Sequence, residues 1–208
     1  MPASDVPSLG ERIREVRVRR GISLRALARD VGVSASMISQ IETGKSRPSV
    51  STLYAITNAL GMSVQDVFEV APAQPPVGSG LPVTVLEALG AARGTRLGPL
   101  VRPAQRQVLT LDSGVTWERL GELPPLHVDF LLVTYAPGGS SSSTGDLMRH
   151  PGWEYGYLIS GALALTLGFE EMSLRPGDAI SFDSTTPHRY RNDGTEPAVG
   201  VWLVIEDR

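Results

Sequence analysis

The stretch 23–44, SLRALARDVGVSASMISQIETG, limits the fold of this chain more than any other segment. Its first half places apolar residues at helical spacing, which predicts one apolar stripe on a short helix: Leu24, Leu27, Ala28 and Val31. Gly32 predicts the end of that helix, because glycine adopts the left-handed turn that other residues resist. A second helix is predicted over 35–42, with Ser34 as its N-cap. The stretch therefore predicts two short helices joined by a tight turn.

Segments on both sides of this stretch also carry helical patterns. Residues 12–20 include five arginines beside apolar positions at helical spacing, and residues 49–60 carry an apolar stripe that follows a proline and ends at a glycine. Ser63 is a suitable cap for a last short helix that runs through Phe68. The whole segment predicts a bundle of five helices.

Two short helices joined by a glycine-containing turn form a helix-turn-helix, whose second helix has the size that the DNA major groove accepts. Residues 9–68 resemble the XRE family, the helix-turn-helix class of the lambdoid phage repressors and Cro. The matching segments are SLRALARDVGVSASMISQIETGKSRPS and LYAITNALGMSVQDVF. The resemblance implies a DNA-binding domain over 9–70. The alternative is a helical bundle without a DNA-binding function.

The resemblance also implies roles for single residues. Arg17 in the first helix is expected to pair with Glu42 at the end of the DNA-reading helix. The residues expected to meet DNA are Ser34, Ala35, Ser36, Ser39, Gln40, Lys45 and Arg47.

Within that set, three small residues stand where the family reads base edges: Ala35, Ser36 and Ser39. They lack the bidentate reach of Arg, Asn or Gln. We therefore expect Gln40, Met37, a contact with a thymine methyl group or the shape of the DNA to contribute more to readout. Lys45 and Arg47 fall in the loop that meets phosphate in the family.

Charge is distributed unevenly along the 208 residues. The net charge of −3 taken alone argues against a nucleic-acid partner. Residues 1–70, however, carry 9 basic and 7 acidic side chains, whereas residues 71–208 carry 10 basic and 15 acidic ones. A mildly basic head predicts modest electrostatic affinity for DNA per monomer.

Composition also indicates the cellular compartment in which the protein is expected. The chain has no cysteine, which excludes disulfides and thiolate metal sites and fits a reducing cytoplasm. We expect no signal peptide and no membrane span, because the longest apolar runs, FLLV and VWLVI, have only the length of strands. A cytoplasmic protein is therefore expected.

The character of the sequence changes after residue 70. The run APAQPPVGSG contains five Pro or Gly residues in ten and predicts a linker, within a connecting segment over 71–95. The part from Leu81 to Arg96 fits either a strand or a short helix. From about Leu97, short segments of alternating apolar residues are separated by turn residues, which predicts an all-β barrel or sandwich. The fold class is therefore multi-domain, with a helical bundle followed by an all-β domain.

The β-rich part carries a second resemblance, over roughly residues 96–206. HPGWE at 150–154, a glycine at 161, PGD at 176–178, PH at 187–188 and Asn192 are similar to the two motifs of the cupin family. Cupins are double-stranded β-helix barrels related to the jelly roll. The resemblance thus implies a cupin barrel that senses an effector.

In the cupin family the two motifs supply three histidines and a glutamate to a metal. Here His150, Glu154 and His188 match three of these four ligands. Met148 stands in place of the first histidine, and a thioether is a poor ligand for hard divalent ions. Ser142, Asp183 and Thr185 replace the family's usual glycine, proline and glycine.

Two imidazoles and one carboxylate form the facial triad of non-haem iron sites. Two interpretations therefore stay open: a divalent metal (Fe, Zn or Ni) on His150, Glu154 and His188, or a polar pocket that requires no cofactor. His127 is expected to be structural or at the surface. In either case the effector pocket is expected to comprise Met148, His150, Glu154, Phe182, His188 and Tyr190.

An XRE-type head joined to a cupin barrel resembles a recurrent class of bacterial transcriptional regulators. It implies a homodimer on a palindromic double-stranded operator, a small-molecule effector and no catalytic residues. The alternative is an enzyme of the phosphonate epoxidase type, a non-haem iron oxygenase that also joins a helix-turn-helix domain to a cupin. A third option is a cupin whose helical head serves only to dimerise.

Overall fold

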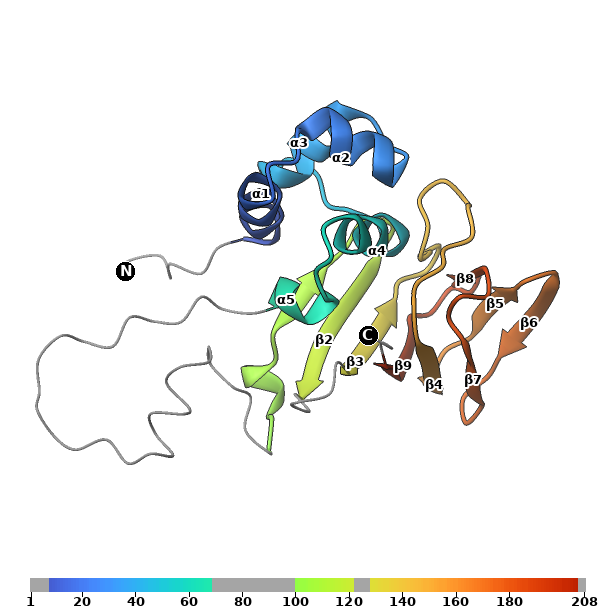
Figure 1. Ribbon diagram of the computed structural model, residues 1–208. Coiled ribbons are helices and arrows are strands. Elements are labelled where there is room, and N and C mark those ends of the chain that lie inside the picture. Colours follow the sequence, from blue (N-terminus) through green and yellow to red (C-terminus); the bar gives the residue numbers. More distant parts are fainter. Residues whose placement is uncertain (1–7, 69–99, 122–127, 206–208) are drawn as a thin grey trace, which may run out of the picture.

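The computed structural model describes residues 8–68, 100–121 and 128–205 (Figure 1). The expected linker over 71–95, and with it the boundaries of the domains, lies outside the described residues, as does His127. Among the described residues, no helix combines the length and the apolar character that a membrane span needs.

The N-terminal part is the predicted five-helix bundle. Its helices are α1 (Leu9–Arg19), α2 (Leu24–Val31), α3 (Ala35–Glu42), α4 (Val50–Ala59) and α5 (Val64–Phe68). Serine side chains cap all five of these helices by accepting a hydrogen bond from a backbone N–H three residues ahead: Ser8, Ser23, Ser34, Ser49 and the predicted Ser63.

The turn between α2 and α3 follows the predicted chemistry. Gly32 ends α2 with φ of 80°, a left-handed conformation that favours glycine. The core of the bundle is built from fully buried side chains on four different helices: Ile13, Leu27, Ile38, Leu53 and Ile56. Gly10 lets α1 approach α3 closely, because a Cβ there would lie 2.2 Å from the carbonyl oxygen of Ile41.

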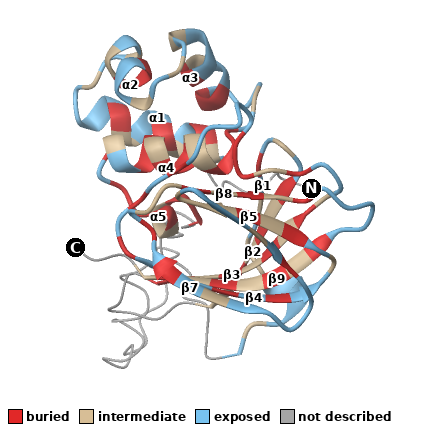
Figure 2. Ribbon diagram, turned by 90° about the vertical axis from the view of Figure 1, so that its right-hand side faces the viewer, coloured by how far each residue is buried: buried red, intermediate tan, exposed pale blue. Residues whose placement is uncertain are grey.

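The C-terminal part contains one short 3₁₀ helix (Pro103–Gln105) and two antiparallel sheets that enclose a barrel (Figure 2). The larger sheet has the order β1-β2-β3-β9-β4-β7 and the smaller sheet the order β6-β5-β8. The strands are β1 (Val108–Thr110), β2 (Val115–Gly121), β3 (Val128–Tyr135), β4 (Trp153–Ser160), β5 (Leu163–Leu167), β6 (Glu170–Leu174), β7 (Ala179–Asp183), β8 (His188–Arg191) and β9 (Ala198–Ile205).

The alternation predicted for the strands is present along β4 and β9. Glu154, Gly156 and Leu158 on β4 are buried, whereas the residues between them face outward. Strand β6 was not predicted, because its polar sequence EEMSL lacks a clear apolar alternation and most of its residues are exposed. The strand β6 forms because it pairs with β5 in an antiparallel ladder, and its own composition does not predict it.

The helical bundle rests on the barrel through α4 and α5. In both views α4 lies between the α2–α3 pair and the barrel (Figures 1 and 2). The N–H of Ser51 donates to the carbonyl of Ser141 at 2.9 Å, and the N–H of Asp112 donates to the carbonyl of Pro48 at 2.9 Å. The amide of Gln65 on α5 donates to the carbonyl of Val128 at 2.6 Å.

Candidate functional site

The first candidate site is the outer face of α3. Its inward side chains, Ile38 and Ile41, are buried in the bundle, whereas Ser36 and Gln40 are exposed. Ala35 and Ser39 are half-buried, and Ser34 caps the helix by accepting from the N–H of Met37 at 3.1 Å. The helix α3 lies on the side of the bundle away from the barrel (Figures 1 and 2), and its exposed side chains are open to solvent.

Arg17 and Glu42 form a buried bidentate pair. The Nε atom of Arg17 lies 2.5 Å from Oε1 of Glu42, and its Nη2 atom lies 2.8 Å from Oε2. The Nη1 atom donates to the carbonyl of Ile22 at 2.9 Å. The hydrogen bond to Glu42 raises the pKa of Arg17 above its ordinary value. The guanidinium thereby joins α1, the turn before α2 and the end of α3.

A basic loop follows α3 directly. Lys45 and Arg47 are both exposed. The backbone N–H of Lys45 donates to the carbonyl of Gln40 at 2.8 Å, which folds the loop against the end of the helix. Two cations therefore lie beside the exposed face of α3, as a phosphate-contacting loop requires.

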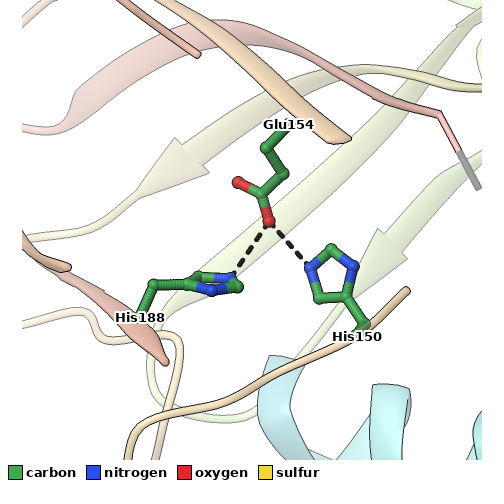
Figure 3. Close-up of side chains that lie close together, drawn as sticks. All are labelled: His150, Glu154 and His188. Carbon is green, nitrogen blue, oxygen red and sulfur yellow. Dashed lines mark hydrogen bonds and ion pairs between the residues drawn. The ribbon is translucent and has the colours of Figure 1, made fainter. Parts of the chain in front are cut away.

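The second candidate site is a buried polar cluster inside the barrel (Figure 3). Glu154 comes from β4, His188 from β8, and His150 from the segment before β4; all three are at most 3% exposed. Oε1 of Glu154 lies 2.8 Å from Nε2 of His150 and 3.1 Å from Nε2 of His188.

Aromatic hydroxyl and indole groups extend this cluster. The Tyr190 hydroxyl donates to Oε2 of Glu154 at 2.8 Å, and the Trp202 indole donates to the Tyr190 oxygen at 3.2 Å. Gly156 makes room for that indole, since a Cβ there would lie 2.8 Å from Cε2 of Trp202. These contacts fix the orientation of the Glu154 carboxylate.

The electrostatics follow from burial and from these contacts. Burial alone would raise the pKa of Glu154, but the interactions with His150 and His188 outweigh it and hold that pKa below its usual range. Burial, with the negative charge of Glu154, raises the pKa of Tyr190 and of Tyr135. The cluster therefore holds a carboxylate beside neutral phenols.

The tautomer of His188 shows how the cluster suits a metal. Its Nδ1 atom lies 2.8 Å from the carbonyl oxygen of Thr186, which can only accept, so Nδ1 carries the proton. In a neutral ring, Nε2 then presents a lone pair toward Glu154. A proton or a metal ion between these two acceptor atoms satisfies both, and a carbonyl that orients a ligand histidine is common in metal sites.

The donor set as a whole fits a divalent metal. One ligand atom from each of His150, Glu154 and His188 lies within 4.8 Å of the others. Two imidazoles and a carboxylate suit Fe, Zn or Ni and leave open coordination positions. Unlike His188, His150 has no hydrogen bond that orients its ring from the side of Nδ1, because that atom has no partner among the described residues.

Next to this cluster lies a cavity of about 20 Å³. Of the residues predicted for the effector pocket, Met148, Glu154 and Tyr190 line it. His150 and His188 touch Glu154, and the ring of Phe182 lies 5.0 Å from that of His188. The predicted residues are thus brought together.

The sequence interpretation missed two residues that line the cavity from the helical bundle, Val50 and Tyr54. A signal was available, because positions 50 and 54 share a helix face that differs from the face formed by Leu53 and Ile56. Two apolar faces on one short helix indicate two packing partners.

Comparison with known proteins finds similarity in both the helical and the β-rich part of the chain. A helix-turn-helix family model matches residues 13–67, and a cupin domain model matches residues 131–204. The HTH-type transcriptional regulator PuuR of Escherichia coli K12 is 26% identical over 185 residues, covering 88% of this chain and 86% of its own. The HTH-type transcriptional regulator SutR of the same organism is 28% identical over 188 residues, covering 90% and 89%.

A solved structure agrees with the fold over nearly the whole chain. The crystal structure of an HTH_3 family transcriptional regulator from Vibrio cholerae has a TM-score of 0.63 and 22% sequence identity. The match covers 96% of each chain. The predicted order of a helix-turn-helix bundle followed by a cupin barrel is thereby confirmed.

Proposed function

We propose that this chain, which joins a helix-turn-helix domain to a cupin domain, is a transcriptional regulator that binds an operator and responds to an effector in its barrel. The observation that carries the proposal is the exposed face of α3 beside the basic loop, braced from behind by Arg17 and Glu42. The similarity to two HTH-type transcriptional regulators along most of the chain supports it. The regulator acts in the cytoplasm, where DNA is available.

In this function α3 enters the major groove. Ala35, Ser36 and Ser39 lie at base edges, with Gln40 as the side chain of longest reach among the exposed polar ones, and Ser34 lies at the start of the helix. Lys45 and Arg47 bind backbone phosphate, which supplies affinity without sequence information. Specificity therefore depends on shape and on few direct contacts.

The regulator is a homodimer on a palindromic operator, because one short helix reads only a half-site and two copies double the contacts. The outward residues of β4 are the face we assign to the second copy: Trp153, Tyr155, Tyr157 and Ile159, each between 44% and 50% exposed. Such a row of large apolar side chains is typical of an interface. Tyr155→Glu with Tyr157→Glu should yield monomers in sedimentation, whereas Phe169→Glu, at an exposed turn, should not.

The barrel is the sensor. His150, Glu154 and His188 are the residues that would hold a divalent metal, and a bound metal would supply a Lewis-acidic attachment point for an effector oxygen or nitrogen. Met148, Phe182 and Tyr190 shape the remainder of the pocket. An effector changes DNA binding only by its difference in affinity for two arrangements of the protein.

Footprinting on genomic DNA fragments tests the function. We expect a symmetric protected site with half-sites about one helical turn apart. Uniform protection without a preferred site would contradict a sequence-specific regulator and would favour a helical head that serves only for dimerisation.

The second candidate function is a mononuclear non-haem iron enzyme, which the two histidines and one glutamate of the barrel favour. Iron content after anaerobic purification separates the two. Stoichiometric iron with oxygen-dependent turnover would support the enzyme, whereas a protein that binds its operator without iron would support the regulator.

A further inference from the structure

The cavity in the barrel is walled in part by the DNA-binding domain. Tyr54 on α4 is 3% exposed, and its ring stacks on the imidazole of His150 at a centroid distance of 3.9 Å and an interplanar angle of 6°. Its edge also meets Trp117 of β2 at 5.9 Å. A side chain of the DNA-binding domain therefore contacts a candidate ligand of the barrel directly.

The size of the cavity makes this contact important. A volume of about 20 Å³ holds roughly one water molecule. Pockets that bind drug-sized molecules span roughly 300–1,000 Å³. An organic effector therefore enters only if one wall of the cavity moves.

The walls differ in how firmly they are held. Most lining residues belong to β2, β3, β4 and β9 of the larger sheet, whose ladders pair these strands along most of their length. Val50 and Tyr54 instead belong to α4, which the barrel holds by backbone hydrogen bonds at Ser51 and at Pro48 just before the helix, and by the ring contacts of Tyr54. Displacing a helix that is docked by few hydrogen bonds costs less than opening a sheet.

We propose that Tyr54 is the roof of the effector cavity and that the cavity opens by movement of α4 away from the barrel. The proposal rests on the function proposed above, because it concerns regulation at the same cavity. Occupancy of the barrel and the position of the DNA-binding domain are thereby coupled through one helix.

The coupling reaches α3 by a short route. The loop that carries Lys45 and Arg47 joins α3 to α4, and α4 also packs on α2. Movement of α4 therefore displaces both the phosphate-contacting loop and the helix that precedes α3. Linkage requires the reverse effect as well: DNA binding changes access to the cavity.

Chemical labelling of histidine tests the roof without DNA and without an effector. Diethyl pyrocarbonate modifies accessible imidazoles, and fragment mass spectrometry distinguishes His150 from His188. The measured quantity is the labelling rate of His150 divided by that of His188. Global unfolding exposes both rings and leaves this ratio unchanged, whereas loss of the Tyr54 ring exposes His150 first and raises it. We expect Tyr54→Ala to raise this ratio about tenfold.

Two control variants distinguish the effect of the Tyr54 ring from that of the stability of α4. Tyr54→Phe keeps the ring and should keep the ratio of the wild-type protein. Leu53→Ala removes a buried side chain of the same helix that does not line the cavity, so it should lower stability without changing the ratio. An unchanged ratio in Tyr54→Ala, or an equal rise in Leu53→Ala, overturns the proposal.

A reversible crosslink tests the movement of α4. The N–H of Ser51 lies 2.9 Å from the carbonyl oxygen of Ser141, and the chain contains no cysteine. In the double variant Ser51→Cys with Ser141→Cys, we expect the oxidised form to label at His150 about tenfold more slowly than the reduced form. Equal rates in a fully oxidised sample would show that the cavity opens by another route.

The labelling ratio tests the role of Tyr54 separately from the proposed regulatory function. A protein that binds no DNA would contradict the regulator, while the labelling ratio would still decide whether Tyr54 roofs the cavity. Conversely, a symmetric footprint with an unchanged ratio would retain the regulator and remove the roof.

Discussion

The helix α3 and the interior of the barrel lie on opposite sides of α4 (Figure 2). They differ in the burial of their polar side chains. On α3, Ser36 and Gln40 are exposed to solvent, whereas Ile38 and Ile41 on the opposite side of the helix are buried. In the barrel, Glu154 and His188 are almost completely buried; Glu154 accepts from Tyr190, and His188 donates to the backbone. A surface that awaits a partner can leave its polar groups to water, whereas a buried group needs a partner within the fold.

Each region nevertheless depends on one buried carboxylate. Glu42 faces a guanidinium that is always charged, so its pair is complete. Glu154 faces imidazoles and a phenol, and the Nε2 lone pair of His188 points toward it. The first arrangement braces a surface, and the second leaves a position that a cation fits.

The largest expected effect is the loss of the Glu42 carboxylate. Glu42→Ala leaves the Arg17 guanidinium buried without its partner, which should lower the free energy of unfolding of the helical bundle by about 3–5 kcal/mol. Chemical denaturation followed by far-ultraviolet circular dichroism measures this loss, and DNA affinity should fall with it.

The matched control is the exposed pair of Arg19 and Glu15, whose atoms lie 3.9 Å apart on α1. Glu15→Ala should change stability by less than about 0.5 kcal/mol, because solvent screens the pair. Equal losses in Glu42→Ala and Glu15→Ala would mean that the buried pair does not brace the bundle.

A smaller effect is expected at Glu154. Glu154→Gln keeps the shape of the side chain but removes the charge that accepts from Tyr190 and faces His150 and His188, which should cost about 1–3 kcal/mol of barrel stability. If the cluster holds a metal, the thermal midpoint of the wild-type protein should also rise with added Zn²⁺, since a ligand of the folded state stabilises it.

The control for this change is Glu170→Gln on β6, where the carboxylate is exposed. It should preserve both the stability and the response to Zn²⁺. A thermal midpoint that rises equally in Glu154→Gln would place the Zn²⁺ outside the cluster.

The contrast between the two regions also explains what the sequence could predict. The helical bundle is specified by local signals, such as serine caps and the glycine at 32, and these predicted all five helices. The triad of the barrel was accessible only through resemblance, because His150 and His188 are 38 residues apart and nothing local relates them. The roles of these residues in DNA and effector binding stay predictions.

Two features could not be derived from local pattern. Strand β6 depends on pairing with β5, and its polar residues carry no alternation that the sequence displays. Tyr54 belongs to a helix whose second packing partner is encoded more than 60 residues away, at Trp117 and His150. Contacts between domains arise from tertiary packing, which local propensity does not contain.

The basic loop offers a smaller and more specific test. Lys45→Ala with Arg47→Ala should weaken binding to all duplexes by about tenfold near 0.1 M salt and reduce the salt slope of log K by about 2. Arg102→Ala with Arg175→Ala makes the same change in net charge at exposed barrel positions and should leave the slope unchanged. A slope reduced equally by both variants would indicate attraction by overall charge only.

The smallest expected effect distinguishes structure from readout within α3 itself. Ser34 caps the helix by accepting from the N–H of Met37, so Ser34→Ala should cost about 1 kcal/mol of stability. Ser36 is two residues further on and exposed, so Ser36→Ala should leave stability within about 0.5 kcal/mol and alter only the preference among operator sequences. Denaturation and competition binding measured on both variants separate the two roles. If Ser36→Ala left the sequence preference intact, readout at this position would come from the shape of the DNA and not from contact with a base edge, because a hydroxyl that touches no base carries no sequence information.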